Sequence, residues 1–145
     1  MSRISTHTQM LKICGVIADR GTCGRLQVGC VIALENRIIS TGYNGPLKGL
    51  PHCNETICNL SNPCTRAIHA EMNAIMFAAK VGIKLQGATL YCTNQPCLQC
   101  ATHILQTGIN KVVYQYPYRD NSGLELLKSF KVETLQHEPT EDSKN

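Results

Sequence analysis

The chain has 145 residues, of which 43% are hydrophobic and 17% charged. This length and composition are typical of one globular domain and exclude a disordered or fibrous chain. The formal net charge of +4 weakly favours an anionic ligand but falls short of the basic surface of a dedicated nucleic-acid-binding protein.

The first half of the chain predicts a helix, a β-hairpin and a long loop. Apolar side chains recur at helical spacing over residues 5–19. Residues 27–43 are rich in β-branched side chains and are interrupted by a short turn at Glu35 and Asn36, which predicts a hairpin. Pro, Gly, Asn and Cys dominate residues 46–66, which we therefore expect to form a loop.

The second half alternates helices and strands. Strong helix formers and terminal glycines predict helices, and β-branched runs predict strands. The helices are expected at 69–82, 96–108 and 122–130, and the strands at 88–94, 110–116 and 131–136. This order implies an α/β fold with a mixed sheet and helices on both faces. We expect one domain over residues 1–136 and a disordered tail over 137–145.

Two absences in the sequence suggest a compartment. No apolar run is long enough to span a bilayer, and the N-terminal segment lacks the apolar core of a signal peptide. We therefore expect a cytoplasmic protein, with no membrane as partner and with reduced thiols. The nine cysteines are an odd number and several are closely spaced. In a reducing compartment this pattern indicates metal binding rather than disulfides.

Three side chains form a candidate zinc site. Cys97 and Cys100, in the segment PCLQC, lie one turn apart at a predicted helix start. Unpaired backbone N–H groups at that helix end favour thiolates. His69 begins another predicted helix. Two thiolates and one imidazole are three zinc ligands, and a catalytic zinc site keeps its fourth position open.

Glu71 indicates a catalytic site. It follows His69 by two residues, so its carboxylate can reach a water that the metal activates without binding the metal itself. A His-x-Glu motif followed by Pro-Cys-x-x-Cys is typical of zinc-dependent nucleobase deaminases. His103 lies on the same helix face as Cys97 and Cys100, and we interpret it as a packing residue because the site is complete without it.

Beyond these residues, the chain resembles the deoxycytidylate (dCMP) deaminases of the cytidine deaminase superfamily. The resemblance covers about residues 8–135 and rests on Tyr118 and on the segments VGCVIALENRIISTGYNGP, HAEMNAI and PCLQCATHILQTGINKVVY. It implies a three-layer fold in which helices flank a five-stranded mixed sheet. It also implies conversion of dCMP to dUMP and ammonia, which would supply dUMP for thymidylate synthesis.

The resemblance assigns roles to individual residues. It implies that Glu71 takes a proton from the water that attacks C4 and delivers protons to N3 and to the leaving amino group. The Ala70 backbone N–H would bind the pyrimidine O2, Asn44 the sugar hydroxyl, and Tyr118 would flank the base or sugar.

The phosphate contact is open among three cations. Arg25 lies in the loop before the first predicted strand, a region that approaches the substrate in this superfamily. Lys48 and Arg66 are alternatives, and each of the three is otherwise a solvated surface charge.

A second zinc site is expected outside the catalytic one. Cys53, Cys58 and Cys64 lie in a loop too polar to order itself by apolar burial, which a closed structural zinc site would order. Cys23 is the expected fourth ligand, supported by the second zinc of phage and bacterial dCMP deaminases, and His52 is the alternative. The three remaining cysteines occupy apolar positions and are expected to be buried hydrophobic residues: Cys14, Cys30 and Cys92.

Several alternatives stay open at this level. A tRNA adenosine deaminase shares the zinc motif, and a deaminase of dCTP differs only in loops that motifs do not fix. A zinc-stabilised binding module without catalysis is a third reading, against which Glu71 argues. The resemblance further implies a homohexamer with dCTP and dTTP as effectors near Gly42–Gly45, and no nucleic-acid partner.

Overall fold

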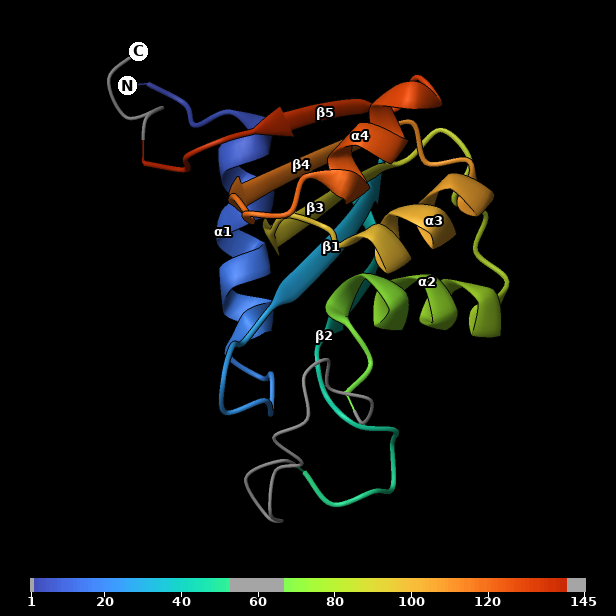
Figure 1. Cartoon of the computed structure of the whole chain (residues 1–145). Helices are drawn as coiled ribbons and strands as arrows, with labels where there is room; N and C mark the ends of the chain where they lie inside the picture. Colours follow the sequence, from blue (N-terminus) through green and yellow to red (C-terminus); the bar gives the residue numbers. More distant parts are fainter. Residues whose placement is uncertain (1, 53–66, 141–145) are drawn as a thin grey trace.

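The computed structural model describes residues 2–52 and 67–140 (Figure 1). In chain order the elements are α1 (Thr6–Ala18), β1 (Gly29–Leu34), β2 (Arg37–Tyr43), α2 (Ala70–Val81), β3 (Thr89–Asn94), α3 (Leu98–Thr107), β4 (Lys111–Tyr116), α4 (Ser122–Ser129) and β5 (Glu133–Gln136). This is the order that the sequence predicts. No helix in the described part of the chain has the length and apolar character needed to cross a membrane.

The five strands form one mixed sheet in the order β2-β1-β3-β4-β5. β1 pairs antiparallel with β2 and β3, whereas β3–β4 and β4–β5 are parallel. Both positions of the turn between β1 and β2 have positive φ, 52° at Glu35 and 61° at Asn36. Two such residues in succession form the tight turn that matches the twist of a hairpin, so the predicted hairpin is confirmed.

Helices cover both faces of the sheet (Figure 1). On one face, Leu11 and Cys14 of α1 pack in a cluster with Val31. On the other face, α2, α3 and α4 pack over a larger cluster that contains Ile32 and Leu90. Neighbouring strand residues such as Val31 and Ile32 thus point to opposite cores, as expected for strands buried on both sides. The predicted three-layer α/β fold is confirmed.

The three cysteines predicted as core residues are fully buried: Cys14, Cys30 and Cys92. Cys30 and Cys92 are directly opposite each other in the β1–β3 pairing.

Two helix boundaries bear on the site. α2 ends at Gly82 and α3 at Gly108, with φ of 79° and 82°, as their glycines predict. α3 begins at Leu98 rather than Pro96, because Cys97 is its extended N-cap residue. The start of α3 therefore lies just beyond the carboxyl end of β3, the edge at which open α/β sheets bind ligands.

Two hydrogen bonds position the start of the segment that follows β5. The His137 backbone N–H donates to the Tyr114 carbonyl at 2.9 Å, and the His137 Nε2 lies 2.8 Å from the Thr8 hydroxyl of α1. Pro139 is buried. His137 thus contacts β4 and the start of α1, and the predicted disordered tail over 137–145 stays a prediction. Residues 141–145 lie outside the described residues.

Candidate metal and active site

The three predicted zinc ligands meet where α2 and α3 begin. His69 is the residue before α2, Cys97 is the residue before α3, and Cys100 lies in the first turn of α3. The His69 Nδ1 is 3.3 Å from the Cys100 Sγ and 3.5 Å from the Cys97 Sγ. All three ligand atoms lie within 4.8 Å of one another. Within residues 2–52 and 67–140, no other such group of His, Cys, Asp and Glu is found.

The surroundings at the start of α3 shift the pKa values of the two thiols in opposite directions. The Cys97 Sγ accepts a hydrogen bond from the Cys100 backbone N–H at 3.5 Å, one of the N–H groups that a helix start leaves unpaired. A hydrogen bond from the Cys100 thiol, aided by His69, lowers the pKa of Cys97 to about 4. The same hydrogen bond with Cys97, together with burial, raises the pKa of Cys100. The two pKa shifts have opposite signs because each thiol is the hydrogen-bond partner of the other.

This donor set fits zinc. Two sulfur atoms and one imidazole nitrogen are the ligands that zinc prefers, and their close approach means that one ion can contact all three. Zinc binding would require both thiols to be deprotonated. Three protein ligands leave one coordination position for water, as in catalytic zinc sites.

Glu71 is the second residue of α2 and is only 4% exposed. Burial raises the pKa of its carboxyl group, an effect that backbone hydrogen bonding and the neighbouring His69 imidazole partly oppose. Glu71 is not part of the three-residue ligand group. A buried carboxyl group with a raised pKa beside a metal site can both accept and return a proton.

β2 and the start of α2 lie in close contact. A Cβ at Gly42 would lie 2.4 Å from the Ala70 carbonyl oxygen, so only glycine allows this approach. Ala70 is fully buried and is the first residue of α2, where backbone N–H groups lack partners within the helix. The predicted use of the Ala70 N–H for a substrate oxygen agrees with this position and stays a prediction.

Asn44 holds the loop that precedes β1. Its Oδ1 accepts the Val28 backbone N–H at 2.8 Å, and its Nδ2 donates to the Leu26 carbonyl at 2.7 Å. This loop carries Arg25, which is exposed. Asn44 thus has a structural role that the sequence did not reveal, and its predicted contact with a sugar hydroxyl remains a prediction.

The other predicted substrate contacts lie in different places. Tyr118 lies in the loop between β4 and α4, and half of its side chain is exposed. Lys48 is exposed and lines a cavity beside the edge strand β2. Arg66 lies outside the described residues, so the choice among the three phosphate candidates stays open.

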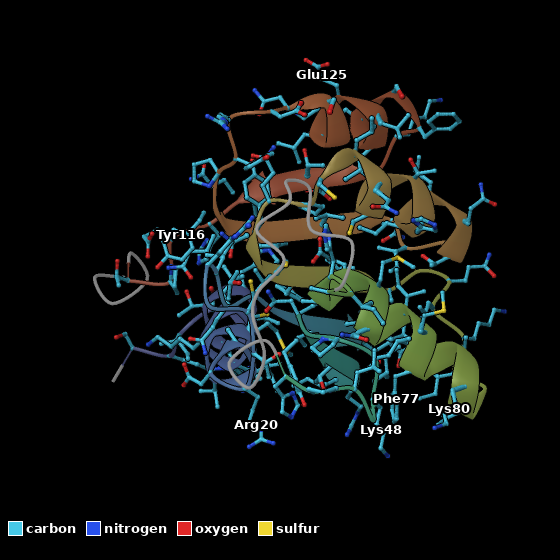
Figure 2. All side chains as sticks on the ribbon, turned by 60° about the horizontal axis from the view of Figure 1, so that its bottom comes forward. Arg20, Lys48, Phe77, Lys80, Tyr116 and Glu125 are labelled. Carbon is cyan, nitrogen blue, oxygen red and sulfur yellow. The ribbon has the colours of Figure 1, made fainter. Side chains whose placement is uncertain are left out.

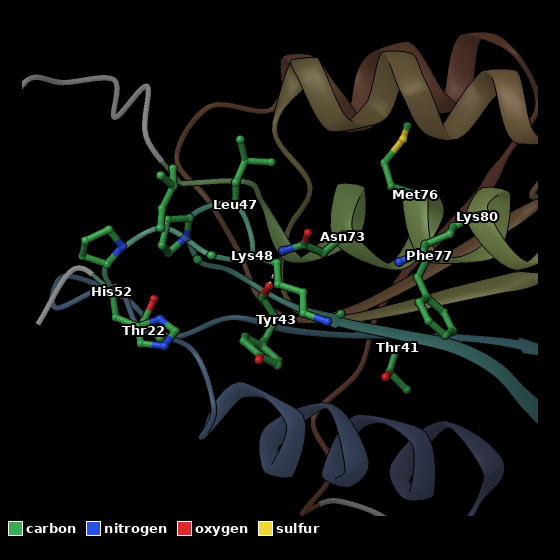
Figure 3. Close-up of a pocket in the computed structure, with 16 residues that line it drawn as sticks. Thr22, Thr41, Tyr43, Leu47, Lys48, His52, Asn73, Met76, Phe77 and Lys80 are labelled. Atoms are coloured by element: carbon green, nitrogen blue, oxygen red, sulfur yellow. Dashed lines mark hydrogen bonds between the residues drawn. The ribbon is translucent and has the colours of Figure 1, made fainter. Parts of the chain in front are cut away.

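The cavity beside β2 has a volume of about 980 Å³ and lies between this strand and α2. Thr22 and His52 lie at one end of it and Phe77 and Lys80 at the other (Figure 3). Lys48, Phe77 and Lys80 gather on one side of the molecule (Figure 2). Between the two ends, Asn73 of α2 donates to the Tyr43 carbonyl at 2.6 Å. The cavity is thus lined in part by Gly42, Tyr43 and Gly45, and the effector site predicted near Gly42–Gly45 stays a prediction.

The second zinc site falls largely outside the described residues. Cys53, Cys58 and Cys64 belong to residues 53–66. Cys23 is half-buried in the loop before β1, and His52 lines the cavity beside β2. The predicted four-cysteine site therefore stays a prediction.

Two residues differ from what the sequence indicates. His103 is exposed, and its Nδ1 bonds the Gln99 carbonyl at 2.7 Å, so the predicted packing role is wrong although it is indeed no member of the ligand group. Gln95 is buried and bonds the loop that carries Tyr118, a role that sequence reasoning missed. The only sequence signal for this role of Gln95 is that a polar residue directly precedes Pro96 and the predicted ligand Cys97.

Several known proteins are similar to this chain. Residues 4–116 match the family model described as "Cytidine and deoxycytidylate deaminase zinc-binding region". The chain is 42% identical over 120 residues to "ComE operon protein 2" of Bacillus subtilis, covering 82% of this chain and 64% of that protein. It is 37% identical over 151 residues to the "Deoxycytidylate deaminase" of Saccharomyces cerevisiae, covering 98% of this chain and 48% of that protein.

The fold also has solved counterparts. The dCMP deaminase of the cyanophage S-TIM5, crystallised in complex with dCMP and dUMP, is 31% identical with a TM-score of 0.79, over 88% of this chain and 93% of that one. The chain spans only about half to two thirds of the length of the two curated relatives above. The match to the family model nevertheless covers most of the chain and every residue of the three-ligand site and Glu71. The chain therefore belongs to the family of proteins that carry the cytidine and deoxycytidylate deaminase zinc-binding region.

Proposed function

We propose that this chain hydrolyses dCMP to dUMP and ammonia, with one zinc ion held by His69, Cys97 and Cys100. The observation that carries the proposal is the buried carboxyl group of Glu71 next to a three-ligand set that leaves a coordination position for water. The similarity to proteins named deoxycytidylate deaminase, and to one solved with dCMP and dUMP, supports the choice of substrate.

Glu71 carries the proton transfers in this proposal. A zinc ion in the site supplies a water molecule of lowered pKa that can attack C4 of cytosine at neutral pH. Glu71 accepts a proton from this water and gives it to N3. It then takes the proton of the new C4 hydroxyl group and gives it to the amino nitrogen, so that the C4–N bond breaks, ammonia leaves and the C4 carbonyl of dUMP forms. One water is consumed, and dUMP and ammonia are the only products, so atoms and charge balance.

The remaining contacts place the substrate. The Ala70 N–H donates to the pyrimidine O2, Asn44 bonds the sugar hydroxyl, and Tyr118 flanks the base or sugar. Arg25 binds the phosphate. In support of this choice, hydrogen bonds that Asn44 makes with Leu26 and Val28 hold the loop that carries Arg25.

Three finer features complete the proposal. A structural zinc is held by Cys23 with Cys53, Cys58 and Cys64. The chain assembles as a homohexamer, and dCTP and dTTP act as effectors. The cavity beside β2, with Lys48 and Lys80 on its wall, has the cationic groups that an effector phosphate requires. We also propose a cytoplasmic location, which would keep the metal-binding thiols reduced.

The direct test is ammonia release from dCMP, dCTP, deoxycytidine and CMP, each with and without dCTP and dTTP. We expect the highest kcat/KM with dCMP. A preference for dCTP, or activity on transfer RNA alone, would contradict the assignment.

The Glu71→Gln variant tests the site itself. It should keep its zinc but lose about 10²–10⁴-fold in kcat, because general acid–base catalysis is removed. Glu125→Gln is the matched control, since Glu125 is exposed in the first turn of α4 and should leave turnover unchanged (Figure 2). Turnover of Glu71→Gln near that of the wild type would remove Glu71 from the mechanism.

A further inference from the structure

The Gln95 side chain joins the end of β3 to the loop between β4 and α4. It is 6% exposed. Its Oε1 accepts the Tyr118 backbone N–H at 2.8 Å. Its Nε2 donates to the Asp120 carbonyl at 3.1 Å and to the Asn121 Oδ1 at 3.3 Å. One buried amide thus makes three hydrogen bonds to three residues within the loop stretch 118–121.

Two backbone contacts fix the ends of this loop on the segment that carries Cys97. Before the loop, the Gln95 N–H donates to the Tyr116 carbonyl at 2.9 Å. After the loop, a Cβ at Gly123 would lie 2.6 Å from the Pro96 carbonyl oxygen and 2.9 Å from the Cys97 carbonyl carbon. Glycine at position 123 therefore lets α4 start directly against the metal-binding turn. The loop and the turn are held as one unit.

The contacts require an amide. Only a side-chain amide offers one acceptor and two donors at the same end, which is what the loop uses. Glutamate has the same shape but no donor for the Asp120 carbonyl and the Asn121 Oδ1. Methionine is of similar length and lacks both functions. Gln95 contacts the backbone carbonyl of Asp120 and not its side chain. The Asp120 carboxylate instead accepts the Ser122 N–H at 2.9 Å.

We propose that Gln95 is a positioning residue, which sets the distance between Tyr118 and the metal-binding turn and thereby the fit of the substrate. This rests on the proposed function, in which Tyr118 flanks the base or sugar. Half of the Tyr118 side chain is exposed, so packing holds this ring less than it would hold a buried one. Its position therefore depends more on the backbone hydrogen bond to Gln95. In this proposal Gln95 acts through the loop that it holds and not through contact with the substrate.

The first test separates substrate fit from chemistry. Gln95→Met should raise KM for dCMP about tenfold and change kcat less, with zinc content unchanged, because the metal ligands and Glu71 stay in place. Gln106→Met is the matched control, as Gln106 is exposed on α3 and should keep the wild-type KM. Gln95→Glu, which keeps the acceptor for Tyr118 but loses both donors, should fall between wild type and Gln95→Met.

A double-mutant cycle shows whether Gln95 acts through Tyr118. Tyr118→Ala should raise KM, and adding Gln95→Met to it should raise KM by less than about twofold more. If the two effects multiply instead, Gln95 does not act through Tyr118 and the proposal is overturned.

Hydrogen exchange provides a readout that needs no activity. The Tyr118 N–H should exchange faster in Gln95→Met than in wild type or Gln106→Met, because it loses its acceptor. If exchange is faster but no variant turns over dCMP, the wild type included, the hydrogen bond of Gln95 to Tyr118 is upheld. Only the proposed function is then overturned. Unchanged exchange at Tyr118 would overturn the role of Gln95, whatever the activity.

Discussion

Two groups of cysteines in this protein have the same side chain and opposite properties. Cys97 and Cys100 lie at the start of α3, where the pKa of Cys97 falls to about 4 through its hydrogen bonds with Cys100 and His69. Cys14 and Cys30 lie in the sheet core, where burial raises the pKa of each thiol. The difference arises from the surroundings: hydrogen bonds from the Cys100 thiol and His69 favour the Cys97 thiolate, whereas burial is the largest influence on Cys14 and Cys30.

This contrast shows where metal chemistry is possible in a cysteine-rich chain. The core thiols stay protonated and pack as small apolar groups. At the helix start, hydrogen bonds lower the pKa of Cys97 and so favour its thiolate, the form that binds metal. The position of each cysteine in the fold is therefore a better indicator of metal binding than the number of cysteines in the chain.

The largest effect is expected from breaking the helix-start pair. Cys97→Ser should lose one zinc per chain and lose more activity than Glu71→Gln, because a neutral hydroxyl is a poor zinc ligand. The fold should persist, since Cys97 is an N-cap residue and serine also caps helices. Metal analysis and a melting curve check this. Wild-type zinc content in this variant would exclude Cys97 as a ligand.

Alkylation sharpens the contrast directly. In metal-free protein, Cys97 should react with iodoacetamide at a rate that changes less than about twofold between pH 5.5 and 7.5, because its pKa of about 4 lies below this range. Free cysteine, with a pKa near 8.5, should speed up roughly a hundredfold over the same interval. Peptide mapping by mass spectrometry gives the rates.

Two outcomes of the alkylation experiment matter. Cys14 should react only after unfolding, since it is fully buried. A Cys97 rate that rises in parallel with free cysteine would show that the helix start does not hold a thiolate. Zinc added before iodoacetamide should protect Cys97 from reaction.

The next effect concerns the predicted second zinc. Cys58→Ser should lower the zinc content from two ions per chain to one, lower Tm and reduce turnover, because residues 46–66 lead into His69. Few large apolar residues lie in this stretch, whereas a structural zinc contributes about 10 kcal/mol or more in favourable peptides.

Cys23→Ser and His52→Ala decide the fourth ligand of this second site. Only the variant that removes the ligand should reproduce the loss seen in Cys58→Ser. One zinc per chain in the native protein would refute the second site altogether.

The smallest effect is expected in the core. Cys14→Ser should cost about 1–3 kcal/mol of unfolding free energy, because it buries a hydroxyl group among Leu11, Val31 and their neighbours. Zinc content and KM should stay unchanged. Urea unfolding at neutral pH gives the free energy. A loss of zinc in Cys14→Ser would mean that the two groups of cysteines are coupled.

Local patterns accounted for the parts of the molecule that neighbouring residues determine. The hairpin at Glu35 and Asn36, the glycine ends of α2 and α3, and the ligand pair Cys97 and Cys100 each depend on residues within one or two turns. His69 joined them because the family motif spans both helix starts. These features were therefore predictable from sequence.

What escaped prediction depends on contacts between distant segments. Gln95 bonds residues 23 to 26 positions later, mainly through backbone atoms that carry no sequence signal. His137 contacts Thr8 of α1, which lies 129 positions earlier in the chain. The sequence predicts Asn44 only as a substrate contact. Its hydrogen bonds to Val28 and Leu26, which lie 16 and 18 positions earlier, carry no local sequence signal.

The contact between Thr8 and His137 has a consequence for engineering. It brings the start of α1 beside the segment after β5, so a short linker can join the two ends of the described chain (Figure 1). New ends can then be opened in the turn at Glu35 and Asn36, which is exposed. In such a circular permutant, residues 37–130, with all three ligands, Glu71, Gln95 and Tyr118, stay on one uninterrupted stretch of chain.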